Sequence, residues 1–415
     1  MSDGERSVMP NVSSFAFWSQ PALVRAPTFA ELRRSAPVSF QEPSDFGMVP
    51  SERGFWAITR HEEVVYVSRR ADVFRSGQGV GLGDVPIDLL ELNASFLVMD
   101  PPRHTALRRV VSGAFTPKRV ALLQAGIEEK ARRIVDEFVE SGGGEVVQDL
   151  SSKLPLWTIC EMMGVPESMR SDLYSAAEAQ MASQDPEFAG DAQERATMAV
   201  QAAQTLHGIA AELCSARRAH RGDDVLSTLV HSELDGQPLS DQILGGIFVL
   251  FSTAGNDTTK NTTSHALKLF ADNPAQWRLL TNESSLMATA VEEVLRCATP
   301  VIHFRRTATA DVTLAGTLIA EGDAVVMFYE SANVDETVFP DAQRFDITRN
   351  PNPHVAFGGG GVHFCLGANL ARTQLRALFS RLAERVWSIE TGKPDFLVSN
   401  FINGIKRMPA RVIAR

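Results

Sequence analysis

Residues 351 to 372 read PNPHVAFGGGGVHFCLGANLAR, and this stretch governs the interpretation of the whole chain. Its four consecutive glycines, 358 to 361, allow backbone conformations closed to other residues, so the segment can fold tightly against a flat partner. Cys365 follows, and the next residues begin a helical run whose amide groups would stabilise a thiolate. Such a cysteine is a ligand or a nucleophile, unless it is the small buried hydrophobic residue that most single cysteines are.

The composition indicates one large domain, 1–415, in a reducing compartment. The chain has 415 residues, 44% of them hydrophobic, and no linker, low-complexity tract or internal repeat divides it. Four scattered cysteines without metal-ligand spacing favour a cytoplasmic protein. The net charge of −10 argues against nucleic-acid binding. We find no signal peptide and no apolar run of about 18 residues, so no membrane anchor is expected.

Hydrophobic periodicity predicts many helices and a few short strands. Residues 1–25 lack a clear period and are predicted to form a loose arm. The Gly-, Asp- and Pro-rich segment 76–92 is predicted to be a mobile loop, and residues 180–191 to connect two helices. Strands are predicted at 55–59, 300–307 and 324–330, helices at 64–67 and from residue 100 onward, and a hairpin tip at 401–404.

The longest predicted helix covers residues 239–273, with Ser240 as its cap and Pro274 beyond its end. Its first half is apolar almost all round and must be buried. Its middle, residues 254–259, reads AGNDTT and consists largely of poor helix formers, a conflict expected at functional sites. If this tract is only structural, its threonine hydroxyls would donate hydrogen bonds to backbone carbonyls of the preceding turn. If it is functional, Asp257 and Thr258 would form an acid–alcohol pair that supplies protons to a buried reaction.

Two charged patterns are ambiguous by themselves. Glu293 and Arg296 form an E-x-x-R, and oppositely charged pairs three residues apart are common on helix surfaces. His104 and Arg108 share one face of a predicted helix, where an ordinary solvated pair is the alternative to a binding site.

The cysteine stretch resembles the haem-ligand loop of the cytochrome P450 family, in which a phenylalanine, glycines, a histidine and the ligand cysteine recur in order. The matching residues are Phe357, Gly359, Gly361, His363, Cys365 and Gly367. This loop has one glycine more than the usual form, and the longer form resembles a bacterial group that hydroxylates steroid side chains and methyl-branched lipids. The central tract resembles the oxygen-binding helix of the family, with Asp257 in place of a more usual glutamate. Asn256, Asn261 and His265 fit the same bacterial group.

This resemblance implies a mainly α fold with a small β region, and haem b held without covalent attachment between the central helix and the cysteine loop. It implies Cys365 as the metal ligand. Further cofactor contacts would come from His104, Arg108, Arg306, His363, Phe357, Gly359 and Gly367. A buried network of Glu293, Arg296 and Arg344 would support the loop. The substrate pocket would be lined by Leu250, Thr253, Ala254, Val301, Ile302 and Ile402, which favours a hydrophobic ligand.

The implied activity is insertion of one O₂ atom into an unactivated C–H bond, with electrons passing from NAD(P)H through a ferredoxin reductase and a ferredoxin. A sterol side chain or a branched lipid is the expected substrate, and a terpenoid or polyketide intermediate is the main alternative. A peroxide-driven haem enzyme and a non-catalytic haem protein are disfavoured by Asp257 and Thr258. We expect a monomer. A cationic docking surface for an acidic redox partner is predicted around Arg103, Arg108, Arg109, Lys118, Arg119, Arg372 and Arg376, with a scattered solvated surface as the alternative.

Overall fold

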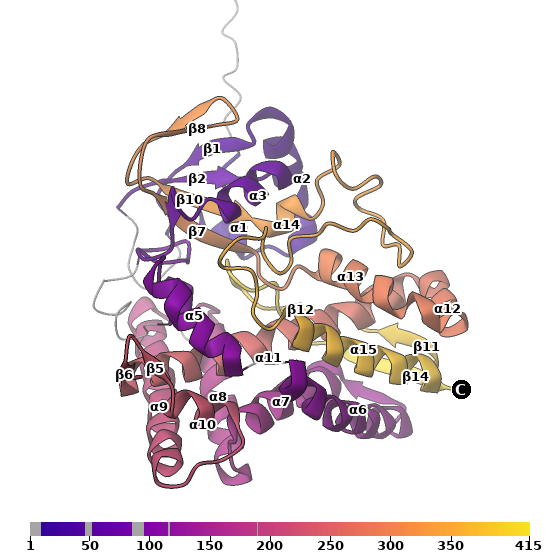
Figure 1. Ribbon diagram of the computed structural model, residues 1–415. Coiled ribbons are helices and arrows are strands. Elements are labelled where there is room, and N and C mark those ends of the chain that lie inside the picture. The colour runs from indigo at the N-terminus through magenta and orange to yellow at the C-terminus, as the bar shows by residue number, and fades with distance from the viewer. Residues whose placement is uncertain (1–9, 46–51, 85–94, 115–116, 189) are drawn as a thin grey trace, which may run out of the picture.

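The computed structural model describes residues 10–45, 52–84, 95–114, 117–188 and 190–415. Figure 1 shows a β region at one end of the molecule and a larger helical region, with α11 (Asp241–Asp272) crossing the middle. This arrangement confirms the predicted mainly α fold with a small β region.

The other helices surround α11 or cover the β region. They are α1 (Phe15–Trp18), α2 (Ala22–Ser35), α3 (His61–Arg69), α5 (Arg103–Ala114), α6 (Pro117–Glu140), α7 (Lys153–Met163), α8 (Glu167–Ala182), α9 (Ala192–Ala219), α10 (Val225–Val230), α12 (Pro274–Asn282), α13 (Met287–Ala298), α14 (Tyr329–Ala332) and α15 (Ala368–Arg385). Shorter helical turns are η1 (Phe96–Val98), η2 (Val147–Ser151) and η3 (Ser284–Leu286). The predicted connection at 180–191 therefore joins α8 to α9.

The β region contains a five-stranded sheet of order β1-β2-β10-β7-β3. Its strands are β1 (Val38–Gln41), β2 (Phe55–Ile58), β10 (Ala324–Phe328), β7 (His303–Ala308) and β3 (Phe74–Arg75). β2 and β10 are parallel, and the other neighbours run antiparallel. The sheet thus joins two parts of the chain that lie far apart in sequence.

The remaining strands form smaller units. A three-stranded sheet has the order β11-β14-β4. Its strands are β11 (Val386–Thr391), β14 (Pro409–Ala414) and β4 (Gly143–Glu145), and the two-stranded units are β5 (Glu233–Leu234) with β6 (Gln237–Pro238), β8 (Val312–Leu314) with β9 (Thr317–Ile319), and β12 (Asp395–Phe396) with β13 (Ile405–Arg407). The predicted tip at 401–404 lies between β12 and β13.

Helix α11 has the ends that its sequence predicts. The Ser240 side chain accepts a hydrogen bond from the Ile243 amide and satisfies one donor of the first turn. The helix ends at Asp272, and Pro274, which cannot continue it, begins α12. Its apolar first half is buried, as predicted. The helix is therefore fixed by its caps and by its packing, which outweigh the weak propensity of its middle.

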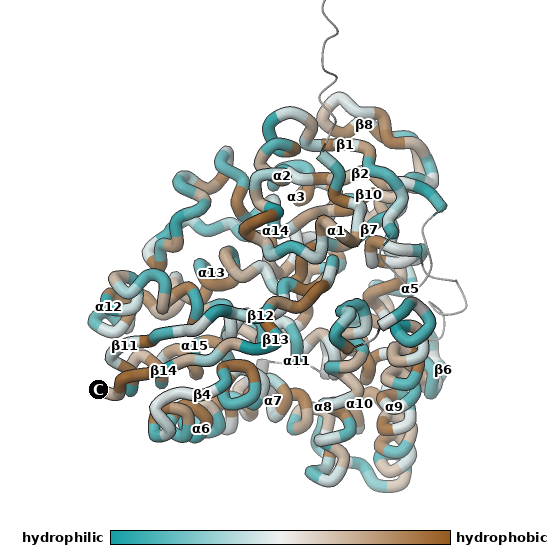
Figure 2. The backbone as a smooth tube through the Cα atoms, turned by 180° about the vertical axis from the view of Figure 1, so that it is seen from behind, coloured by the Kyte–Doolittle hydropathy of each residue, from teal (hydrophilic) through white to brown (hydrophobic). Residues whose placement is uncertain are grey.

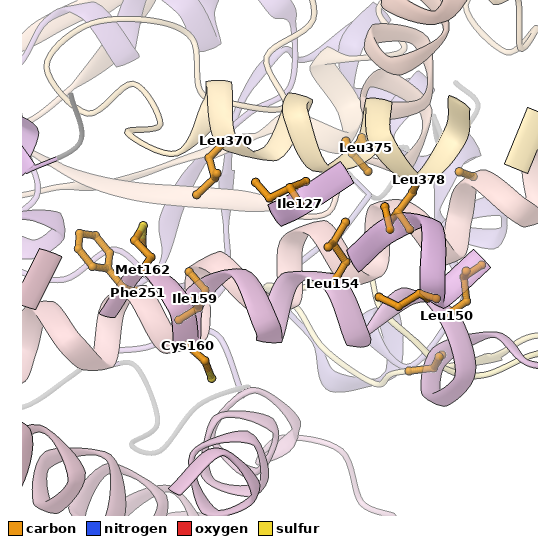
Figure 3. Packing of buried hydrophobic residues seen from close by; sticks show 14 of the residues in the cluster. Ile127, Leu150, Leu154, Ile159, Cys160, Met162, Phe251, Leu370, Leu375 and Leu378 are labelled. Carbon is orange, nitrogen blue, oxygen red and sulfur yellow. The ribbon is translucent and has the colours of Figure 1, made fainter. Parts of the chain in front are cut away.

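The main hydrophobic core surrounds α11. Figure 3 shows Leu375 and Leu378 of α15 near Leu154 of α7 and Ile127 of α6, and all four side chains are buried. In Figure 2, hydrophobic and hydrophilic residues alternate along the outer helices α6 and α9, as expected of helices with one buried face. The core thus holds the α11 axis in place from several sides.

The prediction of a loose arm is wrong for the described part of residues 1–25. Trp18 is buried against Phe29 and Phe328, with ring centroids 6.3 and 5.8 Å away. Arg25 is buried as well, and its Nη2 lies 2.8 Å from Oε2 of Glu330. These contacts fold the segment onto the β region, where aromatic burial outweighs the weak local period.

Two predictions fall partly outside the described residues, namely positions 1–9 of the arm and positions 85–92 of the predicted loop. Among the residues that are described, none of the helices combines the length and apolar character needed to span a bilayer.

Candidate active site

The glycine run packs the cysteine loop against α3. Gly358, Gly360 and Gly361 have φ values of +94°, +94° and +78°, which side chains rarely adopt. A Cβ atom at Gly361 would lie 2.4 Å from the Ser68 carbonyl oxygen of α3. The Cys365 amide donates to the Phe357 carbonyl at 3.0 Å and closes the loop. Positive φ therefore accounts for Gly358 and Gly360, and close contact with α3 accounts for Gly359 and Gly361.

Cys365 precedes α15, with two residues between them. Its side chain is exposed, yet enough protein surrounds it that burial raises the pKa of its thiol. A backbone hydrogen bond at Gly367 and the charges of Arg108 and Arg372 oppose this shift. These three groups favour the thiolate over the thiol, as a metal ligand requires.

One face of α11, at Leu250, Ala254 and Thr258, borders open space, here called the recess. Ala254 is exposed, and Leu250 and Thr258, one turn away on either side, are half-buried, although the helix around them is buried. A series of rings leads from this helix to the cysteine loop. The centroid of Phe96 lies 6.4 Å from that of Phe251 and 6.4 Å from that of His104. The His104 ring in turn lies 4.3 Å from that of His363 in the cysteine loop, so ring contacts connect α11 to the loop through α5.

Four nitrogen-bearing side chains gather beside the loop: His104 and Arg108 of α5, Arg306 of β7, and His363. The rings of His104 and His363 are 4.3 Å apart between centroids. Burial lowers the pKa of His104 to about 4 and the pKa of His363 to about 2, so both are neutral near pH 7. Burial also lowers the pKa of Arg306 and of Arg108.

These side chains lack an anionic partner within the described residues. Both ring nitrogens of His104 are buried without a hydrogen bond there. Asp100 influences His104 and Arg306, but its carboxylate already accepts hydrogen bonds from the Ser76 and Gly77 amides, at 2.7 and 2.9 Å. Buried donors and guanidinium groups without an opposing charge are unfavourable. The cluster therefore fits the two carboxylates of haem, which arginine binds with matching geometry.

The predicted acid–alcohol pair occupies adjacent positions of α11. The Thr258 hydroxyl donates to the Ala254 carbonyl at 2.9 Å, which is the hydrogen bond expected if the tract is only structural. Asp257 has no such role, because its Oδ1 lies 2.5 Å from Nζ of Lys260. Burial raises the pKa of Asp257, and the Lys260 ammonium opposes this shift. A titratable acid thus lies next to a hydroxyl that borders the recess.

The polar residues beyond this pair tie α11 to the hairpin near the C-terminus. The Ile405 amide donates to Asn261 Oδ1 at 3.0 Å, and Nε2 of His265 lies 3.0 Å from the Asn403 carbonyl oxygen. Burial lowers the pKa of His265 to about 4. Asn261 and His265 therefore position the hairpin rather than line the recess.

The predicted pairing of Glu293 with Arg296 is confirmed, and both side chains are fully buried. Nη2 and Nε of Arg296 lie 2.7 and 2.8 Å from the two carboxylate oxygens of Glu293. The prediction of Arg344 as third member is wrong, because its side chain is 64% exposed and 3.8 Å from Asp346. Arg349 takes that place, with Nε 3.1 and 3.2 Å from the Glu293 oxygens.

The predicted pocket residues lie in different environments. Leu250 and Ala254 lie on the open face of α11, whereas Thr253 is almost buried and its hydroxyl donates to the Val249 carbonyl at 2.9 Å. Ile302 is wrong as a pocket residue, because it is 0% exposed and packs in the core with Trp18.

Val301 and Ile402 face each other in an isolated bridge. Val301 keeps part of its surface exposed, and Ile402 is 3% exposed. A role for either in substrate contact stays a prediction.

A set of ion pairs, here called the roof clasp, joins the α8–α9 connection to the hairpin. Nζ of Lys406 lies 3.1 Å from Asp185 and 2.5 Å from Glu187. Nη1 of Arg407 lies 2.6 Å from Glu187. The Val398 amide also donates to Asp185, at 2.9 Å. These contacts join two segments that lie more than 200 residues apart in sequence.

Sequence reasoning missed two charged residues, Lys260 and Arg349. A lysine in a buried helix needs a partner, and Lys260 lies one turn after Asp257, so the sequence did contain that signal. Arg349 follows Arg344 by five residues in an irregular segment, and no pattern distinguishes the two.

We expect the Arg349→Met variant to lose stability, because it removes a charge partner from the buried Glu293 carboxylate. The free energy of unfolding in urea should fall by about 3 kcal/mol. Arg344→Met is the matched control and should change it by less than about 0.5 kcal/mol. Equal losses in the two variants would contradict the assignment of Arg349.

The chain is similar to known proteins over most of its length. The family model described as Cytochrome P450 matches residues 87–391. The methyl-branched lipid omega-hydroxylase of Mycobacterium tuberculosis is 39% identical over 403 residues, covering 96% of this chain and 93% of its own. The steroid C26-monooxygenase of Mycolicibacterium smegmatis is 38% identical over 384 residues, covering 91% and 88%.

A solved structure extends the likeness to the fold. Mycobacterium marinum cytochrome P450 CYP268A2, in complex with pseudoionone, matches with a TM-score of 0.94 and 44% identity, over 99% of this chain and 100% of that one. With a family model that covers most of its length and relatives this similar, the chain belongs to the cytochrome P450 family of haem monooxygenases.

Proposed function

We propose that this cytochrome P450 hydroxylates a sterol side chain or a methyl-branched lipid with electrons delivered by a ferredoxin. The observation that carries the proposal is the similarity of 38–39%, over more than nine-tenths of the chain, to a methyl-branched lipid omega-hydroxylase and a steroid C26-monooxygenase. Leu250 and Ala254 supply an apolar surface on α11, which suits such a ligand.

Haem, when bound, supplies the iron that activates O₂. In this proposal Cys365 provides the thiolate ligand, and the helix N-terminus that follows helps to keep it ionised. Arg108 and Arg306 neutralise the haem carboxylates, with hydrogen bonds from His104 and His363. Phe357, Gly359 and Gly367 shape the loop that carries the cysteine.

The chemistry also requires protons at a buried place. Each productive cycle converts substrate, O₂, NADH and one proton into the alcohol, water and NAD⁺. We assign proton supply to the Asp257 carboxyl and the Thr258 hydroxyl, since the first is titratable and the second borders the recess. A reductive cycle needs this pair, whereas a peroxide-driven enzyme does not.

A terpenoid is the second candidate substrate, and one observation favours it. The solved structure of CYP268A2, which is 44% identical to this chain, holds pseudoionone, a linear ketone with methyl branches. Both candidates share a methyl-branched chain, so the pocket would recognise the end of such a chain in either case.

Substrate binding should distinguish these classes. We expect phytanic acid or cholesterol to shift the Soret band of the purified protein and to be oxidised near a chain end, as mass spectrometry of the product would establish. Pseudoionone is the terpenoid-like arm of the same titration. A Soret shift and an oxidised product with pseudoionone alone would contradict the sterol and branched-lipid proposal and would favour a terpenoid substrate.

Cys365→Ala should abolish the red-shifted Soret band of the reduced, carbon monoxide-bound protein, because the thiolate that produces it is removed. Cys214→Ala is the control, because that thiol is buried in the core on α9, outside both the cysteine loop and the Glu293 network. A red-shifted band that survives in Cys365→Ala would contradict the ligand assignment.

The redox partner is expected to dock at exposed arginines around the cysteine side, among them Arg109 of α5 and Arg376 of α15. The side chains of Lys118 and Arg119, predicted for the same surface, lie outside the described residues, and Arg372 is engaged by Glu292 at 2.7 Å. Arg109→Glu or Arg376→Glu should raise the KM for ferredoxin several-fold at low salt, because charge complementarity steers association. Arg34→Glu on α2 is the control. An unchanged KM for ferredoxin in both test variants would contradict docking at this surface.

A further inference from the structure

A line of four polar side chains runs from α11 to α8. Nζ of Lys260 lies 2.5 Å from Oδ1 of Asp257 and 3.3 Å from Oε1 of Glu178 on α8. The Tyr174 hydroxyl donates to the same Glu178 oxygen at 2.6 Å. Lys260 therefore lies between two carboxylates carried by different helices.

The two carboxylates differ in their access to solvent. Asp257 is 2% exposed, whereas the Glu178 side chain is 38% exposed. Oδ2 of Asp257 is buried without a hydrogen-bond partner in the described structure. An unpartnered buried oxygen of this kind is costly unless it serves as a place where a proton is held.

The charge of Lys260 influences the protonation of Asp257. Burial raises the pKa of Asp257, and Lys260 is the group that most opposes this shift. Burial alone would lower the pKa of Lys260, but Asp257 and Glu178 together raise it, so the ammonium stays charged. Lys260 thus favours the ionised form of Asp257 while it stays close, and the effect of burial, which favours the protonated form, is less opposed when the ammonium moves away.

A buried pair would not need a second acceptor if it were only structural. On the same helix, Lys268 pairs with Asp272 at 2.5 Å near the surface. Glu178 instead offers Lys260 an alternative carboxylate, and because Glu178 belongs to α8, its distance from Lys260 depends on where α8 lies relative to α11.

We propose that Lys260 is a positioning residue that alternates between Asp257 and Glu178, so that the placement of α8 decides when Asp257 can take up and pass on a proton. This inference rests on the proposed role of Asp257 in proton supply. It adds Lys260 and Glu178 to the residues that govern the reaction. It also links α8, the helix that precedes the roof clasp in sequence, to the Asp257 carboxyl.

The test compares Lys260→Met, Lys260→Arg and Glu178→Gln in the haem-loaded enzyme, with NADH, a ferredoxin system and phytanic acid. An unproductive cycle converts O₂, NADH and one proton into hydrogen peroxide and NAD⁺, so product and peroxide are both counted against NADH. Lys268→Met on α11 and Glu167→Gln on α8 are the matched controls, since both alter exposed charges of the same helices.

We expect Lys260→Met to lower product per NADH roughly tenfold, with a matching rise in peroxide and a changed solvent isotope effect. The reason is that Asp257 then lacks the ammonium that controls its protonation. Lys260→Arg should restore coupling. Glu178→Gln should lower kcat without changing KM, because Lys260 then stays with Asp257. Turnover driven by added hydrogen peroxide should not change in any variant. Wild-type coupling in Lys260→Met together with a wild-type kcat in Glu178→Gln would overturn the proposal.

A separate measurement keeps this result distinct from the substrate proposal. Thermal unfolding of Asp257→Asn, Lys260→Met and the double variant should be non-additive, because the two side chains form one buried pair. Additive losses would overturn the inference even with an active enzyme. If wild-type protein oxidises none of the probes, the substrate proposal fails, and the unfolding cycle still decides whether Asp257 and Lys260 act together.

Discussion

The buried Glu293 carboxylate is the group on which the cysteine side of the molecule depends. It accepts hydrogen bonds from Arg296 of its own helix, from Arg349 and from Asn352, and from the amide of Asp346. Through these bonds, α13 holds the irregular segment that leads into the cysteine loop. A fully buried carboxylate tolerates no loss of a partner, so this segment has a single arrangement. The loop itself is then fixed by its glycine contacts with α3.

The sequence predicted the large features well and the irregular ones poorly. Helix α11 was predicted to within two residues, because its caps and its long apolar run are local signals. His363 and Cys365 were identified together because the loop motif has a fixed order, and the structure brings the His104 ring to 4.3 Å from that of His363. In contrast, Arg344 was chosen in place of Arg349, because the direction of a side chain in an irregular segment depends on contacts that are far apart in sequence. The arm over residues 1–25 was misjudged for a similar reason, since Trp18 is ordered by residues more than 300 positions later.

Helix α11 shows how stability and chemistry share one element. Its threonines bond back to the backbone, and its asparagine and histidine anchor the hairpin, so most of its polar groups are structural. Asp257 differs from them, since its partner is the Lys260 ammonium rather than a backbone group. The poor helix formers in the middle are therefore tolerated because caps and core packing hold both ends of the helix, which leaves the centre free for function.

The roof clasp has two layers that respond differently to dissolved ions. The contact of Lys406 with Asp185 is nearly buried, and the Val398 amide reinforces it. The pair of Arg407 with Glu187 is exposed and is subject to screening, which acts over about 8 Å at physiological ionic strength. Rising salt would loosen the outer pair first and leave the inner contact in place. The attachment of the α8–α9 connection to the hairpin would therefore weaken in two stages as the ionic strength rises, first at the Arg407–Glu187 pair and later at the contact of Lys406 with Asp185.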